Sequence, residues 1–113
     1  MLRRVLVCGG RGYTDAARIA EVIGIFDPQA VTIVHGNARG ADRTAANVAL
    51  TLGFDVEAHP ADWEEYGNAA GPIRNQAMLD TGVDLVVAFP GGRGTADMTD
   101  RAKRAGVPVL PII

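Results

Sequence analysis

The sequence has little cysteine and no long apolar run. Its one cysteine, Cys8, excludes an intramolecular disulfide, and its two distant histidines, His35 and His59, do not give the ligand spacing of a zinc site. No apolar run approaches the roughly 18 residues that a membrane helix needs. The basic and apolar start ends at Gly9, which is typical of a first strand rather than a signal peptide. We therefore expect a cytoplasmic protein with no metal, no cofactor and no membrane span.

Lysine is almost absent as well, because ten of the eleven basic residues are arginine. The formal net charge of −2 argues against a protein that coats nucleic acid by charge. Arginine, however, is the residue best suited to bidentate capture of phosphate. A chain of 113 residues is long enough for one buried core and too short for two. We therefore expect a single domain over residues 1–113 that carries both fold and function.

Short apolar runs alternate with segments of helical spacing along the chain. The predicted strands are residues 4–9, 30–35, 55–59, 85–89 and 107–113, and the predicted helices are residues 15–26, 41–52, 72–81 and 95–105. Prolines in the last strand favour an edge position. The alternation predicts a Rossmann-like three-layer α/β/α fold with a parallel five-stranded sheet in the order 3-2-1-4-5. Its ligand crevice should lie beyond the carboxyl ends of strands one and four.

Glycine-rich segments follow the strands at this edge. Residues 90–95, Pro-Gly-Gly-Arg-Gly-Thr, lie between a buried strand and a helix, where backbone N–H groups and the helix dipole favour an anion. The alternative is a tight turn in which glycine only relieves steric strain. Residues 9–12 match a dinucleotide fingerprint only in part, and His35 stands where a ribose-binding acid is expected. Ordinary NAD binding is therefore disfavoured, and the sequence contains no P-loop lysine.

Four arginines are predicted to lie on the crevice side, namely Arg11, Arg39, Arg74 and Arg93. Arg74 is interpreted as a phosphate or ribose contact, with a solvated helix arginine as the alternative. Residues 62–75 are predicted to form a long loop, and such loops are often lids or binding loops. Trp63 or Tyr66 in this loop could stack on a base or simply cover the core.

Two further residues allow two interpretations each. Asp42, in the first turn of a helix, either contacts the ligand or compensates the helix dipole, and the sequence favours neither. Cys8 could act as a nucleophile beside His35, but a lone cysteine inside an apolar strand is more typical of a core residue.

Four segments together resemble the SLOG superfamily, most closely its YspA-type branch. They are residues 9–12, residues 35–42, residues 71–75 with the sequence Gly-Pro-Ile-Arg-Asn, and residues 90–95, and the similarity extends over nearly the whole chain. The resemblance implies a Rossmann-like domain that binds nucleotides or nucleotide-derived signals. Among SLOG proteins, LOG enzymes cleave the N-glycosidic bond of nucleoside 5′-monophosphates, and DprA-type relatives bind single-stranded DNA. The resemblance to SLOG proteins also implies that this chain forms a homodimer or a larger assembly.

LOG enzymes have an arginine earlier in the chain than the glycine loop, and a glutamate three residues after the threonine of that loop, in the pattern Pro-Gly-Gly-x-Gly-Thr-x-x-Glu. Arg74 can stand for the arginine, but the glutamate position is Met98, with Asp97 just before it. This departure argues against LOG-type hydrolysis by the usual residue. Met98, Ala102 and Ala105 also fit a buried helix face.

Three functions are consistent with these observations. The first is a module that binds a nucleotide or a nucleotide-derived phosphorylated ligand. The second is a phosphoribohydrolase in which Arg74 acts with a replacement carboxylate from Asp97, Asp42 or Glu64. The third is single-stranded nucleic-acid binding in the same crevice. The predicted ligand contacts are Gly9, Gly10, Arg11, Gly36, Arg39, Gly40, Asp42, Trp63, Arg74, Asn75, Pro90, Gly91, Gly92, Arg93, Gly94 and Thr95.

Overall fold

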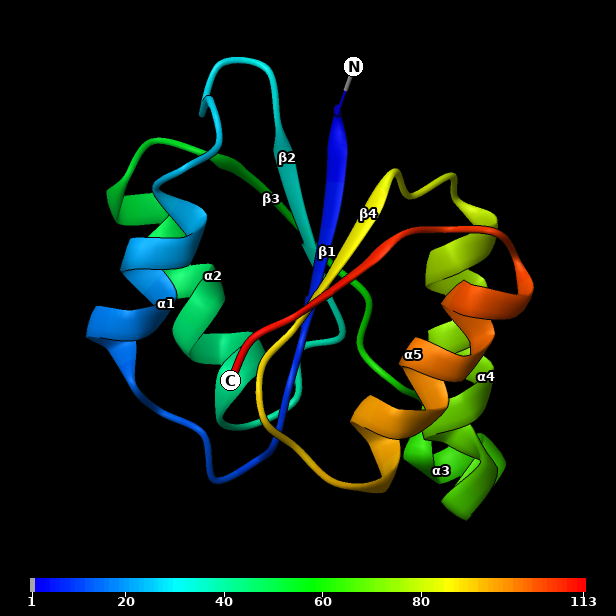
Figure 1. Cartoon of the computed structure of the whole chain (residues 1–113). Coiled ribbons are helices and arrows are strands. Elements are labelled where there is room, and N and C mark those ends of the chain that lie inside the picture. Colours follow the sequence, from blue (N-terminus) through cyan, green and yellow to red (C-terminus); the bar gives the residue numbers. More distant parts are fainter. Residues whose placement is uncertain (1) are drawn as a thin grey trace.

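Strands and helices alternate along the chain in the computed structural model, which describes residues 2–113 (Figure 1). The elements are β1 (Arg4–Cys8), α1 (Ala16–Ile23), β2 (Thr32–His35), α2 (Ala41–Thr51), β3 (Asp55–Ala58), α3 (Trp63–Tyr66), a 3₁₀ turn (Gly67–Ala69), α4 (Ala70–Asp80), β4 (Leu85–Ala88), α5 (Arg93–Arg104) and β5 (Val109–Pro111). Within residues 2–113, every helix is too short or too polar to cross a membrane.

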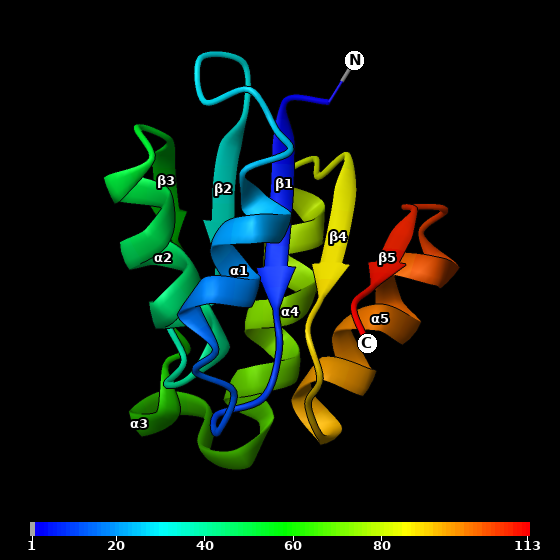
Figure 2. The same ribbon diagram turned by 60° about the vertical axis from the view of Figure 1, so that its left-hand side comes forward.

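The five strands form one parallel sheet in the order β3-β2-β1-β4-β5, which confirms the predicted order. Leu6 in the central strand lies opposite Val34 on one side and Val86 on the other. Helices α1 and α2 cover one face of the sheet, and α4 and α5 cover the other (Figure 2). The short strand β5 lies at an edge, where the sheet tolerates the missing N–H of Pro111. The Rossmann-like three-layer fold is therefore confirmed.

The alternation of side chains along β1 creates two cores. Val5 and Val7 point toward α1 and α2, whereas Leu6 and Cys8 pack with residues of α4 and α5. Both faces of a parallel sheet are buried in this way, which explains why β4 and all of β1 after Arg4 are apolar.

The interpretation of Met98 as a core residue is confirmed, because its side chain is fully buried against the sheet. Ala102, one turn later, is also fully buried. The expectation that Ala105 shares this face is wrong: Ala105 caps the C-terminus of α5 and is exposed. The helix has ended there, so the periodic pattern no longer decides which way the residue points.

Several boundaries differ from the predicted ones. Helix α1 ends at Ile23 rather than at residue 26, because Ile25 and Phe26 donate their N–H groups three residues back and tighten the last turn. Helix α4 begins two residues before Pro72. Proline is tolerated there because an N–H in the first turn has no partner within the helix. Helix α5 begins at Arg93, so Gly94 and Thr95 belong to its first turn.

The predicted loop over residues 62–75 is instead largely helical. Asp62 caps α3 by accepting a hydrogen bond from the N–H of Glu65 at 3.1 Å. The 3₁₀ turn follows directly and leads into α4 without an extended linker. The residues that were expected in a long loop are therefore held on helices below the carboxyl edge of the sheet (Figure 2).

Candidate functional site

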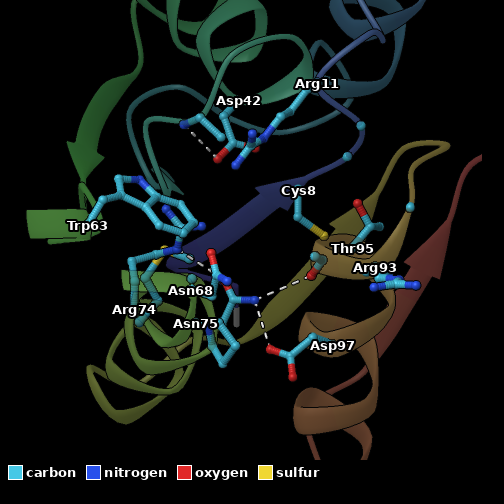
Figure 3. A pocket seen from close by; sticks show the side chains of 18 residues that line it. Cys8, Arg11, Asp42, Trp63, Asn68, Arg74, Asn75, Arg93, Thr95 and Asp97 are labelled. Carbon is cyan, nitrogen blue, oxygen red and sulfur yellow. Dashed lines mark hydrogen bonds between the residues drawn. The ribbon is translucent and has the colours of Figure 1, made fainter. Parts of the chain in front are cut away.

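A pocket of about 750 Å³ lies beyond the carboxyl ends of the central strands, at the predicted crevice (Figure 3). Its walls come from the end of β1, the start of α2, the segment from α3 into α4, and the start of α5. The predicted residues that line it are Gly9, Gly10, Arg11, Asp42, Trp63, Arg74, Asn75, Gly92, Arg93, Gly94, Thr95 and Asp97. Segments far apart in the sequence thus meet at one cavity.

The other predicted site residues lie outside the lining of this pocket, namely Gly36, Arg39, Gly40, Glu64, Pro90 and Gly91. Arg39 and Glu64 are exposed. Gly36 and Gly91 lie just behind residues that do line the pocket. The structure therefore brings three of the four crevice arginines to the cavity and leaves Arg39 outside it.

Some residues of the pocket wall are not among the predicted ligand contacts. Cys8, Ala38 and Met78 contribute apolar surface, and Asn68 contributes a polar side chain from the 3₁₀ turn. Gly71 and Pro72 belong to the segment that carries the family resemblance, but they were not proposed as contacts. No pattern in the neighbouring sequence predicts that Asn68 lines the pocket, because its position depends on how the 3₁₀ turn packs.

The N-terminus of α5 opens into the pocket without a side-chain cap. Its N-cap residue is Gly92, which has no side chain that could accept from the first-turn N–H groups. Helix α1 differs, since Asp15 accepts a hydrogen bond from the N–H of Arg18 at 3.0 Å. The first turn of α5 therefore presents free N–H donors and the positive end of a helix dipole to the cavity. These are the features of an anion site.

Glycines allow the loops around the pocket to pack closely. The N–H of Gly10 donates to the carbonyl of Pro90 at 2.9 Å, which joins the loops that follow β1 and β4. A Cβ atom on Gly91 would lie 2.6 Å from the nitrogen of Gly10, and one on Gly9 would lie 2.6 Å from the Cβ of Ala41. Any side chain at these positions would push the loops apart.

Arg74 is half-buried and fixed by two acceptors. Its Nη1 donates to the carbonyl of Gly36, and its Nε donates to Oδ1 of Asn75 at 3.0 Å. A Cβ atom on Gly36 would lie 2.6 Å from Cζ of Arg74, so glycine leaves the space that the guanidinium occupies. Burial lowers the pKa of Arg74 and nearby Asp42 opposes this effect. An arginine stays charged despite such a shift.

Asp42 is buried although it carries a carboxyl group, with only 5% of its surface exposed. Its Oδ2 accepts from the N–H of Gly36 at 3.0 Å and from the N–H of Ala38 at 3.3 Å. Burial raises the pKa of Asp42, while the Ala38 and Gly36 N–H groups and the Arg74 charge act in the opposite direction. The carboxylate therefore fixes the loop before α2 and also faces the pocket.

Asn75 joins α4 to the start of α5. It is buried, and its Nδ2 donates to Oδ2 of Asp97 at 3.0 Å and to the carbonyl of Gly94 at 3.3 Å. Nε of Arg101 donates to the same Asp97 oxygen at 2.9 Å. Burial acts to raise the pKa of Asp97, but the hydrogen bonds from Asn75 and Arg101 outweigh it and lower the pKa overall. Asp97 is thus an ionised carboxylate on the pocket wall.

Trp63 and Arg11 meet at the mouth of the pocket. Cζ of Arg11 lies 5.7 Å from the centroid of the Trp63 ring, which is a cation–π contact between the loop after β1 and α3 (Figure 3). The edge of the same ring lies over Gly71, where a Cβ atom would be 3.4 Å from Cη2. Tyr66, the other aromatic residue of this segment, does not line the pocket.

The thiol of Cys8 is unsuited to nucleophilic attack. Burial, with a smaller effect from the charge of Asp42, raises its pKa to about 12, so the thiolate is scarce at neutral pH. His35 is also buried, and its Nδ1 accepts from the N–H of Asn37 at 3.0 Å. The structure therefore supports the core interpretation of Cys8.

Comparisons with known proteins agree with this architecture. The model of the YspA, cpYpsA-related SLOG family matches residues 3–66. The Gene 61 protein of Mycobacterium phage D29 is 40% identical over 119 aligned residues, which cover 96% of this chain and 95% of the phage protein. The C-terminal domain of a hydrogenase from Pyrococcus furiosus has the same fold, with a TM-score of 0.55 at 18% identity over 97% of this chain and 91% of that domain. The family match covers more than half of the sequence, and the chain belongs to the YspA, cpYpsA-related SLOG family.

Proposed function

We propose that the pocket binds a nucleotide or a nucleotide-derived phosphorylated ligand, with a phosphate at the N-terminus of α5. The observation that carries this proposal is the uncapped first turn of α5, which opens into the cavity next to Arg93. Backbone N–H groups and a helix dipole bind phosphate in many α/β proteins. Membership of the SLOG family supports a nucleotide-related function.

The charge of the pocket wall also favours an anion. Arg11, Arg74 and Arg93 line the cavity, and none of them forms an ion pair with a carboxylate within residues 2–113. One oxygen of Asp97 is already engaged by Asn75 and Arg101. The pocket wall is therefore locally positive, although the net charge of the chain is −2. An anionic ligand would neutralise this local positive charge.

Trp63 supplies a surface for the base. Trp63 is 47% exposed and lines the pocket, and the Arg11 guanidinium lies over the face of its ring. A nucleobase can occupy the same face by stacking, because a guanidinium and a base both bind to an aromatic ring plane. Arg11 is then free to approach the phosphate.

Isothermal titration calorimetry with adenosine and guanosine 5′-monophosphate tests the proposal. Arg74→Ala and Arg93→Ala should each weaken binding by about 10- to 100-fold, the range for a hydrogen bond to a charged group. The matched control is Arg39→Ala, which removes an exposed arginine outside the pocket and should leave the affinity unchanged. Equal affinities in all four proteins would contradict the proposal.

N-glycosidic hydrolysis is a second candidate, favoured by the ionised carboxylate of Asp97 on the pocket wall. Such a group can stabilise an oxocarbenium-like transition state, the role that the buried Met98 cannot fill. Chromatographic detection of free base after incubation with nucleoside monophosphates tests this candidate. Release by the wild type and not by Asp97→Asn would support hydrolysis, whereas intact nucleotide in both would remove it.

A further inference from the structure

Asp42 has one carboxylate oxygen that the protein does not use. Both of its hydrogen bonds, from the N–H groups of Gly36 and Ala38, go to Oδ2. No donor within residues 2–113 binds Oδ1. The residue as a whole is only 5% exposed. Oδ1 is therefore the oxygen of Asp42 that still has its full capacity to accept a hydrogen bond.

The vacant oxygen opens into the pocket. Among residues 2–113, every side-chain nitrogen or oxygen that is sealed from solvent has a hydrogen-bond partner, so Oδ1 is not sealed inside the protein. Asp42 lines the cavity, and the cavity is therefore the route by which a partner reaches this oxygen (Figure 3). A ligand in the pocket can approach it directly.

The chemistry of this oxygen limits what the ligand presents to it. The N–H groups of Gly36 and Ala38 and the charge of Arg74 favour the ionised form of Asp42, and in that form the oxygen accepts hydrogen bonds and repels a phosphate. Asp42 belongs to α2 on one face of the sheet, whereas the proposed phosphate site belongs to α5 on the other face (Figure 1). The ligand must therefore carry its anion at α5 and a hydrogen-bond donor at α2.

We infer that Asp42 is a specificity-determining residue that accepts a hydrogen bond from a sugar hydroxyl, so that the pocket selects ribonucleotides over deoxyribonucleotides. This inference rests on the proposed function. In a nucleotide the hydroxyls lie between the phosphate and the base, and they are donors whatever the base is. A site built around such a donor discriminates strongly against an analogue that lacks it, because the bound analogue covers the acceptor and leaves it unpaired.

Calorimetric titration of the wild type with adenosine 5′-monophosphate and its 2′-deoxy and 3′-deoxy analogues provides the test. At least one of the two deoxy compounds should bind about 10- to 100-fold more weakly, as expected for a lost bond to a charged acceptor. Inosine 5′-monophosphate, which lacks the base amine, should retain the affinity of the adenosine compound. This series needs no variant, so it does not depend on the folding of a mutant.

Asp42→Asn then separates recognition from loop structure. The amide keeps an oxygen for the Gly36 and Ala38 N–H groups but can present a donor to the pocket, so the preference for the ribose compound should fall below about threefold. Asp100→Asn, on an exposed part of α5, should keep the wild-type preference. A merely structural role of Asp42 would change all three affinities together and leave their ratios intact.

The outcomes separate the two proposals. Tight and equal binding of the ribose and both deoxy compounds overturns the inference and leaves nucleotide binding standing. Discrimination by the base amine instead of the hydroxyls also overturns it. Failure of every nucleotide to bind removes the proposed function, and the inference with it.

Discussion

Arginines at the two ends of the parallel sheet have opposite surroundings. At the amino end of β1, Arg4 donates to both carboxylate oxygens of Glu57, at 2.9 and 2.6 Å. The same guanidinium donates to the carbonyl of Gly82 at 3.1 Å and to Oγ1 of Thr81 at 2.8 Å. Arg4 therefore links β1, β3 and the end of α4, and its hydrogen-bonding capacity is largely used within the protein.

At the carboxyl end, Arg11, Arg74 and Arg93 have no carboxylate partner among the described residues 2–113. The side chains of Arg93 and Arg11 form no hydrogen bond within residues 2–113, and Arg11 lies over the face of Trp63. Arg74 donates to a carbonyl and to Asn75, but it forms no ion pair. The difference shows that residue type alone does not separate structural from binding arginines. What distinguishes them is whether a carboxylate is paired with the guanidinium.

The largest expected effect is on the pocket end, from Gly36→Ala. The added methyl group would overlap the Arg74 guanidinium and displace it, so nucleotide affinity should fall by about tenfold or more. The free energy of unfolding should change little, because the displaced group is the far end of a flexible side chain. Calorimetry and thermal unfolding measure the two effects. Gly12→Ala is the control, since a Cβ atom there meets nothing within 4 Å.

The amino end should respond in the opposite way to Arg4→Met. Removal of the bidentate pair should lower the free energy of unfolding by about 1 kcal/mol, the upper range for an ion pair that is partly exposed to water. Nucleotide affinity should stay within twofold of the wild type. Urea unfolding measures the stability, and Arg18→Met, which removes a looser exposed pair at 3.4 Å, is the control. A loss of affinity in Arg4→Met would break the comparison.

A smaller effect is expected from acid. Hydrogen bonds from Arg4 and then His59 lower the pKa of Glu57 to about 2, whereas an unfolded glutamate titrates near about 4.3. The folded state binds this proton less readily, so the contribution of the pair is complete above the unfolded pKa and is lost as pH falls toward the folded value. The stability difference between wild type and Glu57→Gln should therefore shrink from about pH 5 to about pH 2. A constant difference over that range would contradict the assignment.

The smallest effect concerns the Arg11–Trp63 contact. An exposed cation–π pair is worth about 0.5–1 kcal/mol, so Arg11→Ala should change stability by no more than that. The protein has a single tryptophan, and its fluorescence reports on this contact without labelling. Arg11→Ala should shift the emission of the free protein, and nucleotide should quench it in both proteins. An unchanged spectrum on saturation with nucleotide would place the base elsewhere.

The order of the strands could be predicted from the sequence because crossovers between parallel strands obey strong topological rules. The place of the pocket followed from that order. The position of the Arg74 side chain could not be predicted, because it depends on a contact with Gly36, which is 38 residues away in the chain. The difference between Arg39 and Arg74 could not be predicted either. Arg39 lies between β2 and α2 and Arg74 lies in α4, and only the packing of the folded chain decides which of the two enters the cavity.

The helical structure of residues 63–69 was not predicted, for a different reason. Helices of one turn have almost no periodic pattern, and packing rather than propensity stabilises them. The cap at Asp62 was the available signal, with Glu65 three residues later. The vacant oxygen of Asp42 had no signal in the sequence, because burial and the partners of each oxygen are properties of the folded chain.

The most direct test of the central claim is nuclear magnetic resonance of the backbone amides during titration with adenosine 5′-monophosphate. A phosphate at the N-terminus of α5 should give its largest amide shifts at Arg93, Gly94 and Thr95, whose N–H groups have no side-chain cap. The amides of β5, remote from the pocket, should stay in place. Saturating shifts confined to other parts of the chain, or no shifts at all, would contradict the account.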